Sequence, residues 1–586
     1  MRIVRSGLVG TLLACTVVLL APAGASAAIG EITFDACVED LGLPNTGCTA
    51  ENQGLLGASS VAVSPDGRSV YVSGGNEDIV SIFSRNTSTG ALTPAGCISD
   101  ADIFPGSGCA DFAEGLNAPA GIAIAPSGLD VYVAGNNDQA IVHLARDPNT
   151  GDLSDGGCVP FTGDSAGCGT TTQPGIERPW DLVVSPDGAS VYVVSSFFGG
   201  SVARLTRNTS TGDISASGQC IADAGGTPAG CGGTQEGLAG ARAMAISADG
   251  ASLHVVSRDD GSLVSLKPDL SSLGCFADVG APLAGCTSVE GLSGGGPGMG
   301  VAVSPDGGSV YTKVADGGAG VVVQFDRSAA GALTHVGCIQ DTGASTGCAQ
   351  SAQGLAGDGD IAVSSDNASV YAVSDVDDAI VRFDRNTTTG ALTPLGCIAD
   401  AGTTGCASLA PALDQSRGVT VSPDSRSVYQ TSQGDSAITH YTRESNVVTP
   451  PPATGEIRLD AGKAKCKGSC KKIKVKVTVD KPGVVQFCNA PAGVNAPCGI
   501  AGQGPTAPRP VLAKKAPKLI VDKELDVAEA GTVTTSLKLT KKARKTIAKK
   551  GKLSIKLQVD FTPTGGELAS DRSTLKVKGK KKKKKK

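Results

Sequence analysis

Short runs of apolar residues alternate with polar residues along most of the chain, at the two-residue period of a strand buried on one face. In the first clear example the run Val61 to Val63 ends at a Ser-Pro-Asp-Gly turn over 64–67, and the alternating run Ser69 to Val72 follows. The same pattern occurs seven times, at intervals of 57 to 62 residues. The seven turns begin at Ser64, Ala125, Ser185, Ser247, Ser304, Ser364 and Ser422. Each repeat therefore predicts two antiparallel strands joined by a tight turn.

Each repeat continues with a third apolar run that ends on a basic residue, and in most repeats a glycine-bearing hairpin and a fourth run come next. The seven basic residues are Arg85, Arg146, Arg207, Lys267, Arg327, Arg385 and Arg443. Four short antiparallel strands repeated seven times are typical of a seven-bladed β-propeller. The predicted fold class is therefore all-β, with a propeller over residues 28–446.

The seventh repeat has no obvious fourth strand, because a proline run at 450–452 follows its third strand. An unpaired strand-like run, Gly30 to Asp35, precedes the first repeat. We expect this N-terminal strand to complete the seventh blade, because closing the ring removes an open sheet edge that would invite aggregation.

Two cysteines lie at the same point of every repeat, in the long connection from the outer strand of one blade to the inner strand of the next. The expected pairs are Cys37 with Cys48, Cys97 with Cys109, Cys158 with Cys168, Cys220 with Cys231, Cys275 with Cys286, Cys338 with Cys348 and Cys397 with Cys406. Their common position favours local pairing, and each bridge would close a loop that is otherwise easily cleaved. Seven equivalent pairs favour structural disulfides over a redox site, which needs an exposed and activated pair.

The run Ser-Pro-Asp-Gly-Arg-Ser-Val-Tyr-Val at 64–72 and the run Phe-Asp-Arg-Asn-Thr-Thr-Thr-Gly-Ala-Leu-Thr at 383–393 resemble the repeats of lactonase-type seven-bladed propellers and of the related YVTN propellers. The resemblance covers residues 29–446. It implies the propeller fold, and it implies that an enzyme of this kind would hydrolyse sugar lactones, as 6-phosphogluconolactonase-type propellers do, with polar side chains at the mouth of the central channel. Fold alone does not imply that activity.

A single active site on a ring must use positions that differ between the blades. Residues five and four positions ahead of each turn enter the inner strands, so we expect them to surround one mouth of the central channel. The first set is Ser59, Ala120, Trp180, Arg242, Met299, Gly359 and Arg417, and the second is Ser60, Gly121, Asp181, Ala243, Gly300, Asp360 and Gly418. Some of these positions carry charged residues and others carry small residues, so the seven blades differ from one another at the channel mouth.

Trp180 is the only tryptophan of the chain. An aromatic plate with a few convergent charges suits a small anionic or hydroxylated ligand. The candidate ligand-binding residues are Glu177, Arg178, Trp180, Asp181, Arg242, Asp360 and Arg417. The alternative is that Trp180 only fills the channel and that the charges are solvated.

We predict no metal and no cofactor. Acidic loops at 77–78, 259–260 and 375–378 follow the second strands of their blades, but none has the spacing of a calcium loop. We therefore expect a solvated acidic face. The four histidines occupy ordinary repeat positions and form no metal cluster or catalytic triad.

The charge is divided unevenly along the 586 residues. Residues 1–455 carry 18 basic and 46 acidic side chains, whereas residues 456–586 carry 33 and 10. After a proline-rich linker at 447–455, six strand-like runs predict a basic Ig-like β-sandwich over 456–579. Seven consecutive lysines follow at 580–586.

The basic region also holds four cysteines, namely Cys466, Cys470, Cys488 and Cys498, which allow three disulfide pairings. Its charge favours an anionic cell-envelope polymer or a membrane surface as partner, and the alternative is a disordered solubilising tail. We expect no specific nucleic acid, because the region has few aromatic residues for base stacking.

The N-terminus has the order of a secretory signal peptide over residues 1–27: two arginines, an apolar run from Leu8 to Ala21, and Ala25-Ser26-Ala27. A lipoprotein box ending at Cys15 is disfavoured because the apolar run continues beyond it. The mature chain would then carry an even number of cysteines in an oxidising compartment. We expect a secreted protein that associates with the cell envelope.

Two functions follow as hypotheses. The first is an extracellular binding or scaffold module held at the envelope by the basic C-terminal domain. The alternative is a hydrolase of sugar-type lactones whose site lies at the mouth of the central channel.

Overall fold

The structure is a computed structural model. It describes residues 29–43, 47–101, 107–161, 167–226, 230–292, 300–316, 318–400, 405–445, 457–460, 463–465, 471–479, 483–489, 519–521, 523–527, 531–563 and 569–578. The chain divides into two compact units, Met1–Val447 and Val448–Lys586. The predicted signal peptide, linker and lysine tail lie outside the described residues, as do Met299, Cys466, Cys470 and Cys498.

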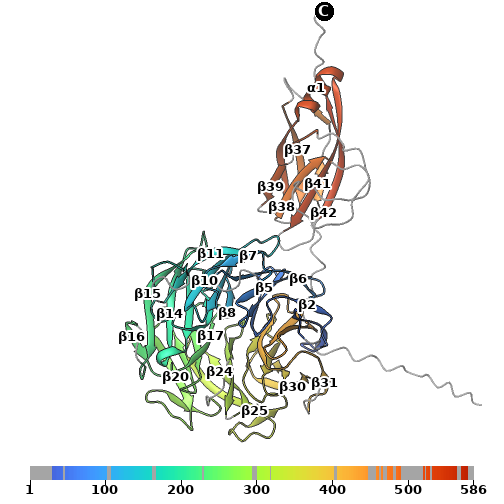
Figure 1. Ribbon diagram of the computed structural model, residues 1–586. Coiled ribbons are helices and arrows are strands. Elements are labelled where there is room, and N and C mark those ends of the chain that lie inside the picture. Colours follow the sequence, from blue (N-terminus) through green and yellow to red (C-terminus); the bar gives the residue numbers. More distant parts are fainter. Residues whose placement is uncertain are drawn as a thin grey trace, which may run out of the picture. The chain divides into compact units, whose positions relative to one another are not determined.

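The strands of the first unit form seven sheets whose inner strands contact one another in a closed ring (Figure 1). The inner strands are β3 (Ala58–Val63), β8 (Pro119–Ile124), β12 (Pro179–Val184), β17 (Ala241–Ile246), β22 (Gly300–Val303), β27 (Ile361–Val363) and β32 (Ser416–Val421). The second strands are β4 (Ser69–Gly74), β9 (Asp130–Gly135), β13 (Ser190–Ser195), β18 (Leu253–Ser257), β23 (Ser309–Asp316), β28 (Ser369–Ser374) and β33 (Ser427–Ser432). The predicted seven-bladed propeller is confirmed.

The outer half of each blade also has a regular order. The third strands are β5 (Ile79–Arg85), β10 (Ala140–Arg146), β14 (Ser201–Arg207), β19 (Ser262–Leu266), β24 (Ala319–Arg327), β29 (Ala379–Arg385) and β34 (Ala437–Arg443). The fourth strands are β6 (Leu92–Asp100), β11 (Leu153–Pro160), β15 (Ile214–Asp223), β20 (Ser272–Asp278), β25 (Leu333–Asp341), β30 (Leu392–Ala399) and β1 (Ile32–Asp40). A short 3₁₀ helix, η2 (Phe197–Gly199), joins β13 to β14.

Six blades have a fifth, short strand that the repeat pattern did not predict. It pairs in parallel with the fourth strand, just beyond the cysteine pair. These strands are β2 (Ala50–Asn52), β7 (Asp111–Ala113), β16 (Gly233–Gln235), β21 (Thr287–Val289), β26 (Gln350–Ala352) and β31 (Ser408–Leu409).

The ring closes as predicted, through the N-terminal strand. β1 pairs antiparallel with β34 from Ile32↔Arg443 to Glu39↔Ala437 and completes the seventh blade. The backbone N–H of Gly30 adds a bond of 2.6 Å to the carbonyl of Glu444. The first and last parts of the propeller are therefore held in one sheet.

The seven local disulfides are also confirmed, with sequence separations of 9 to 12 residues. Each closes the connection between two blades and should contribute roughly 2 to 3 kcal/mol of stability. Disulfides in this number are typical of a protein that lies outside the cytoplasm. The bonds join Cys37 to Cys48, Cys97 to Cys109, Cys158 to Cys168, Cys220 to Cys231, Cys275 to Cys286, Cys338 to Cys348 and Cys397 to Cys406.

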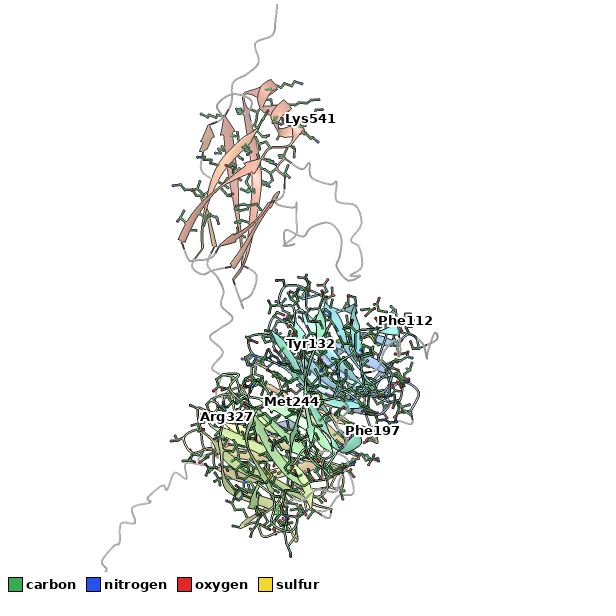
Figure 2. The ribbon with its side chains drawn as sticks, turned by 90° about the vertical axis from the view of Figure 1, so that its left-hand side faces the viewer. Phe112, Tyr132, Phe197, Met244, Arg327 and Lys541 are labelled. Atoms are coloured by element: carbon green, nitrogen blue, oxygen red, sulfur yellow. A yellow bond between two sulfur atoms is a disulfide. The ribbon has the colours of Figure 1, made fainter. Side chains whose placement is uncertain are left out.

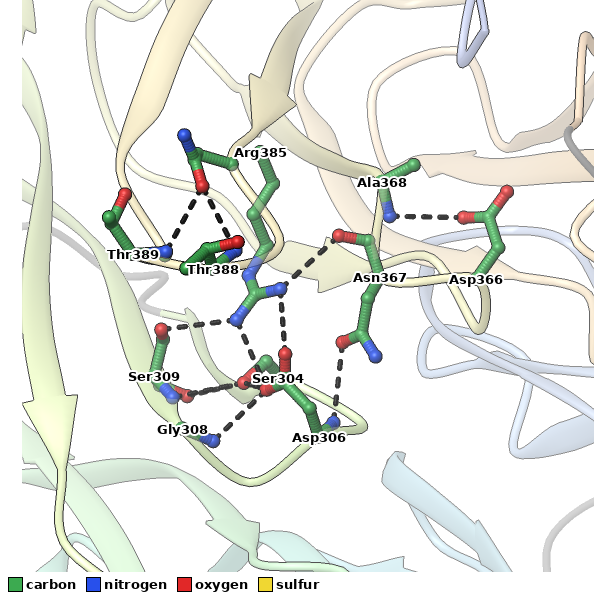
Figure 3. A network of polar contacts seen from close by, with 12 residues as sticks. Ser304, Asp306, Gly308, Ser309, Asp366, Asn367, Ala368, Arg385, Thr388 and Thr389 are labelled. Carbon is green, nitrogen blue, oxygen red and sulfur yellow. Dashed lines mark hydrogen bonds and ion pairs between the residues drawn. The ribbon is translucent and has the colours of Figure 1, made fainter.

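Most blades are joined to the preceding one by the arginine that ends the third strand. Arg385 is an example: its Nη1 and Nη2 donate to the carboxylate of Asp306 at 2.9 and 3.1 Å (Figure 3). Its Nε donates to Tyr311 Oη at 2.8 Å. Tyr311, Asp306 and the further acceptor Ser309 all belong to the preceding blade. The repeated tyrosine, aspartate and arginine of the sequence therefore form contacts between blades.

The acidic loops are only in part the solvated face that we expected, because Asp259 is exposed but other carboxylates are bound to the backbone. Asp78 is only 8% exposed, and its Oδ1 accepts the backbone N–H of Ala118 in the next blade connection at 2.7 Å. Asp138 Oδ2 accepts the N–H of Asn117 in the same connection at 3.0 Å. The reason is that this irregular backbone needs hydrogen-bond partners, and the carboxylates provide them.

The second unit has a three-stranded sheet and a five-stranded sheet around one apolar core that includes Val475, Phe487 and Leu557. Its strands are β35 (Ile457–Asp460), β36 (Lys463–Lys465), β37 (Lys472–Val479), β38 (Gly483–Asn489), β39 (Lys523–Val527), β40 (Gly531–Lys538), β41 (Lys552–Pro563) and β42 (Ala569–Lys578). One helix, α1 (Lys541–Lys550), was not predicted; it begins at Thr540, whose side chain accepts the N–H of Ala543. The proposed Ig-like relationship stays a prediction.

Among the described helices, none has the length and apolar character needed to span a bilayer.

Candidate functional site

A cavity of about 290 Å³ lies where the inner strands of the propeller begin. Its lining residues are Ser59, Ser60, Ala120, Gly121, Trp180, Asp181, Arg242, Ala243, Gly359, Asp360, Arg417, Gly418 and Gln433. The structure thus brings together five of the seven candidate residues: Trp180, Asp181, Arg242, Asp360 and Arg417. Their role as ligand residues stays a prediction.

Glu177 and Arg178 do not line this cavity. They precede β12 instead of lying in it, and Arg178 is exposed, with its guanidinium carbon 5.3 Å from the ring centre of Phe197, which Figure 2 labels. The structure therefore does not bring these two residues to the cavity, and their role as ligand residues stays a prediction.

Arg242 is the cation that dominates the cavity. Its guanidinium carbon lies 3.7 Å from the ring centre of Trp180, which is a close stacking contact. Trp180 is itself held by a bond of 2.6 Å from its Nε1 to Ser196 Oγ. The indole ring therefore fixes the plane of the guanidinium.

The buried Nε and Nη1 atoms of Arg242 find no hydrogen-bond partner in the described part of the chain. Burial lowers the pKa of Arg242 to about 10, and the nearby charges of Arg258 and Arg417 act in the same direction. Buried donors without acceptors are costly, so this group favours an oxygen-bearing or anionic ligand.

Arg417 differs from Arg242 because its charge is compensated. Its Nε donates to Gln433 Oε1 at 3.0 Å, and its Nη1 lies 3.1 Å from Asp375 Oδ2. Asp375 comes from the loop after β28, in the neighbouring blade. Gln433 and Asp375 therefore hold the guanidinium of Arg417 in the cavity wall. The Nε and Nη1 donors of Arg242 have no such acceptors among the described residues.

Two carboxyl groups complete the wall. Asp181 accepts the N–H of Leu182 and, from the next blade, that of Met244, each at 2.8 Å. Asp360 does the same with Ile361 at 2.8 Å and with Val419 of the next blade at 3.2 Å. The two aspartates thus link neighbouring inner strands.

Burial raises the pKa of Asp181 to about 6 and that of Asp360 to about 7, and the charge of Asp181 adds to the rise at Asp360. Carboxyl groups with such values can exchange a proton near neutral pH. The cavity therefore combines a proton-exchanging acid with an arginine whose buried Nε and Nη1 have no acceptor among the described residues.

Glycines let the inner strands approach these carboxyls. A Cβ atom on Gly121 would lie 2.8 Å from Asp181 Cα, and one on Gly300 would lie 2.7 Å from Asp360 Cα. Both contacts are too short for any larger residue. The alternation of glycine and aspartate around the mouth is thus a packing requirement.

Sequence reasoning missed Gln433 and Lys313. Gln433 lines the cavity from the loop after β33, which the inner-strand alignment did not include. Lys313 lies fully buried in β23, where other second strands carry residues such as Ser73 and Val256, and its Nζ donates to the carbonyl of Gly357. Comparing the second strands position by position would have found this lysine.

Burial lowers the pKa of Lys313 to about 8, although the carboxylates of Asp358 and Asp375 partly oppose that change. Asp375 also pairs with Arg417. Lys313 thus belongs to a buried charge network behind the cavity wall and contributes no lining atom.

The described residues hold no group of three or more metal-binding side chains suited to a metal ion. The histidines make local contacts instead: His143 Nε2 lies 2.8 Å from Asp130, and His254 lies between Ser252 and Ser265.

A family model described as "Lactonase, 7-bladed beta-propeller" matches residues 38–168. The match supports the lactonase-type propeller family. It spans the end of the N-terminal strand and the first two blades, which is less than half of the chain. A comparison with curated proteins finds no match.

Solved structures similar to the chain include the periplasmic gluconolactonase of Pseudomonas aeruginosa, at 17% identity and a TM-score of 0.43, covering 65% of this chain and 94% of that one. Kuenenia stuttgartiensis hydrazine synthase has 14% identity and a TM-score of 0.42, with 68% and 98% covered. A Lactobacillus plantarum protein has 18% identity and a TM-score of 0.41, with 63% and 96% covered. Likeness at this level carries no conclusion about activity.

Proposed function

We propose that the propeller is a hydrolase of sugar-type lactones and that the central cavity is its active site. The observation that carries this proposal is Arg242, whose buried Nε and Nη1 donors face no acceptor among the described residues. The lactonase family match over residues 38–168 supports the same reaction class.

In this proposal Arg242 binds the carbonyl oxygen of the lactone. The stacking on Trp180 holds the guanidinium in one plane, so its donors are oriented before the substrate arrives. Donors fixed in this way stabilise the negative charge that develops on the carbonyl oxygen as it is attacked. Arg242 is therefore assigned the electrophilic role.

Asp360 is assigned the role of general base. Its pKa of about 7 suits proton transfer at neutral pH. A water molecule attacks the carbonyl carbon while Asp360 takes one of its protons. The ring C–O bond then breaks, and the proton returns from Asp360 to the departing alkoxide, which yields the open hydroxy acid.

The size and charge of the cavity restrict the substrate. A volume of about 290 Å³ lies at the small end of the range for ligand sites, which suits one sugar-sized ring. Ser59 and Ser60 add hydroxyl groups to the lining, and Arg242 adds positive charge. We therefore propose hydroxylated lactones, with or without an anionic substituent, as the substrate class.

The test is ring opening by the full chain, measured against a panel of plain and phosphorylated aldonolactones. We expect Arg242→Gln to lower kcat/KM by at least 100-fold, the loss typical of one oxyanion donor. Arg178→Gln is the matched control, because Arg178 lies two residues before Trp180 but outside the cavity. No lactone opened faster than its spontaneous hydrolysis would refute the proposal and leave the binding or scaffold function.

As a second function, we propose that the C-terminal unit attaches the protein to an anionic cell-envelope polymer or membrane surface. The supporting observation is a cavity of about 460 Å³ at the start of α1, lined by Lys471, Lys472, Val521, Lys538, Leu539, Thr540, Lys541 and Arg544. The first turn of α1 has no acidic residue to compensate these charges.

The test is cosedimentation of the full chain with anionic and neutral vesicles and with an insoluble phosphate polymer, at rising salt. Attachment should weaken steeply with salt and should be reduced in a Lys471→Glu, Lys541→Glu double variant. Binding that neither salt nor the variant changes would exclude this function.

A further inference from the structure

The contact between blades described for Arg385 is present at six of the seven blade junctions. At each of them the guanidinium that ends one third strand binds the turn of the preceding blade. The six arginines are Arg85, Arg146, Arg207, Arg327, Arg385 and Arg443.

The acceptors of these guanidinium groups are nearly the same each time. Arg146, for example, donates from Nε to Tyr71 Oη at 2.7 Å, from Nη1 to the carbonyl of Gly128 at 2.8 Å, and from Nη2 to Asp66 and to Ser69 Oγ at 2.9 Å. A complete set is thus a tyrosine hydroxyl, a glycine carbonyl, an aspartate carboxylate and a serine hydroxyl. Together they match the planar, multi-donor guanidinium.

The junction between the third and fourth blades has all four acceptors, but its third strand is followed by Lys267. A cavity of about 190 Å³ lies there. It is lined by Ser185, Pro186, Asp187, Ser190, Tyr192, Arg204, Ile246, Asp249, Gly250 and Pro268. Tyr192, Gly250, Asp187 and Ser190 are the counterparts of the four acceptors that bind Arg146.

These acceptors are arranged as at the other junctions. Tyr192 Oη donates to the carbonyl of Pro268 at 2.9 Å, as Tyr71 Oη does to that of Gly151 at 2.7 Å. Asp187 Oδ1 accepts Ser185 Oγ at 2.5 Å, as Asp66 Oδ1 accepts Ser64 Oγ at the same distance. Unlike Asp66, Asp187 forms no ion pair with an arginine within the described residues.

Lys267 itself does not enter the cavity. It is exposed and is not among the lining residues. An ammonium is a compact point charge and cannot reach four acceptors that are spread over two blades. The acceptors of this cavity therefore suit a guanidinium group and do not bind the ammonium of Lys267.

One cation, Arg204, does line the cavity, and its Nε donates to Ser190 Oγ at 3.0 Å. It does not prevent the binding of a second guanidinium. At the junction of the sixth and seventh blades, Arg382 occupies the same place, opposite Tyr371 in the sheet, and Arg443 still binds Tyr371 Oη at 2.7 Å.

We propose that this junction is a binding site for a guanidinium group supplied from outside the propeller, either as free arginine or as an arginine side chain of another polypeptide. In this site the carboxylate of Asp187 supplies the negative charge, and Tyr192 Oη and the carbonyl of Gly250 accept N–H groups of the guanidinium. A ligand reaches the site from solvent, because Asp187 is exposed and Gly250 is half-buried. The six occupied junctions are the internal template for this assignment. It is independent of the lactonase proposal, because none of these residues lines the central cavity.

The experiment is a ligand-observed NMR titration of the full chain with Nα-acetyl-arginine amide, using Nα-acetyl-lysine amide as the comparison. Because the ligand is small and Asp187 is exposed, we expect a Kd on the order of millimolar for the arginine compound. The lysine compound should bind at least tenfold more weakly. Equal binding of the two, or none, would overturn the proposal.

The variant Lys267→Arg supplies the guanidinium from the chain itself and should weaken arginine binding at least tenfold. Lys267→Met is the matched control; it removes the lysine without filling the site and should leave binding within twofold. Asp187→Asn should weaken binding about fivefold even if the new arginine of the first variant points elsewhere. Binding that survives both Lys267→Arg and Asp187→Asn would place the ligand at another site and refute the assignment.

Two further ligands separate the sources of the group. A Gly-Arg-Gly peptide blocked at both ends should bind as well as the amide if a polypeptide side chain is recognised. If the arginine amide and free arginine bind but the blocked peptide does not, with the same response to Lys267→Arg, the site is assigned to the small molecule.

Discussion

The guanidinium of Arg242 lies over the indole of Trp180, with its carbon 3.7 Å from the ring centre. The two residues lie at the start of the inner strands of consecutive blades, so the contact comes from the packing of β12 against β17. The single tryptophan of the chain thus acts through an arginine that is 62 positions away in the sequence.

Trp180→Leu should lower kcat/KM for lactone opening about fivefold or more. Removing the ring costs about 1 kcal/mol of cation–π attraction and frees the guanidinium to leave its plane. Trp180→Phe should keep most of the activity, since an aromatic face remains. Kinetics and thermal melting of the two variants check this, and equal activity in both would remove Trp180 from the positioning of Arg242.

The activity should rise with pH as Asp360 loses its proton. Its pKa of about 7 predicts that kcat/KM increases between pH 6 and 8 and then levels off, since only the carboxylate can accept the proton of water. Asp360→Asn should abolish turnover, while Asp181→Asn should shift the profile to lower pH by removing a neighbouring negative charge. A profile with no inflection in this range would exclude Asp360 as the base.

The positions around the channel mouth could be predicted from the sequence because the turn at the end of each inner strand fixes the register. Counting back from Ser185 therefore finds Trp180, and counting back from Ser247 finds Arg242. The partners of these residues could not be found in this way. Arg242 and Arg417 look equivalent in the repeat, but Asp375 pairs with Arg417 from a neighbouring blade, whereas the buried Nε and Nη1 of Arg242 have no acceptor among the described residues.

The strands of the propeller likewise differ in how well the sequence predicts them. The four long strands of a blade have alternating patterns, and all were predictable. The fifth strand has three residues or fewer, such as Asp111–Ala113, and a run this short carries no periodic signal. In the first blade it pairs with the fourth strand just beyond the disulfide between Cys97 and Cys109.

The stability of the propeller should fall as the pH rises from about 4 to 7. Burial raises the folded-state pKa of Asp138 and Asp378 to about 6, and the charges of Asp100 and Asp414, respectively, add to the rise. A folded state that binds these protons more tightly than the unfolded chain is favoured while they are bound, below the ordinary pKa of 3.8. That advantage is lost as the pH passes through 6.

Carboxyl groups whose pKa is lowered in the folded state have the opposite effect and reduce the stability of the propeller at low pH. The pKa of Asp249 is lowered to about 2 by hydrogen bonds from Ser247 and Arg327 that outweigh its burial, so its contribution is present above pH 3.8 and disappears below. Thermal melting should therefore show a maximum near pH 4. Asp138→Asn, which keeps the shape but cannot ionise, should raise Tm at pH 8 and leave it nearly unchanged at about pH 3, below the ordinary pKa; an equal shift at both values would contradict this explanation.

Replacing a junction arginine should destabilise the ring without changing its active site. Arg385→Met leaves the carboxylate of Asp306, which is one-third exposed, and the hydroxyl of Tyr311 without their donors, at a cost of about 3 kcal/mol. Lys267→Met, the same change at the junction that has no guanidinium, should cost less than about 0.5 kcal/mol. Urea unfolding of the two variants measures the difference, and equal losses would show that the blades are joined by their apolar cores alone and not by these arginines.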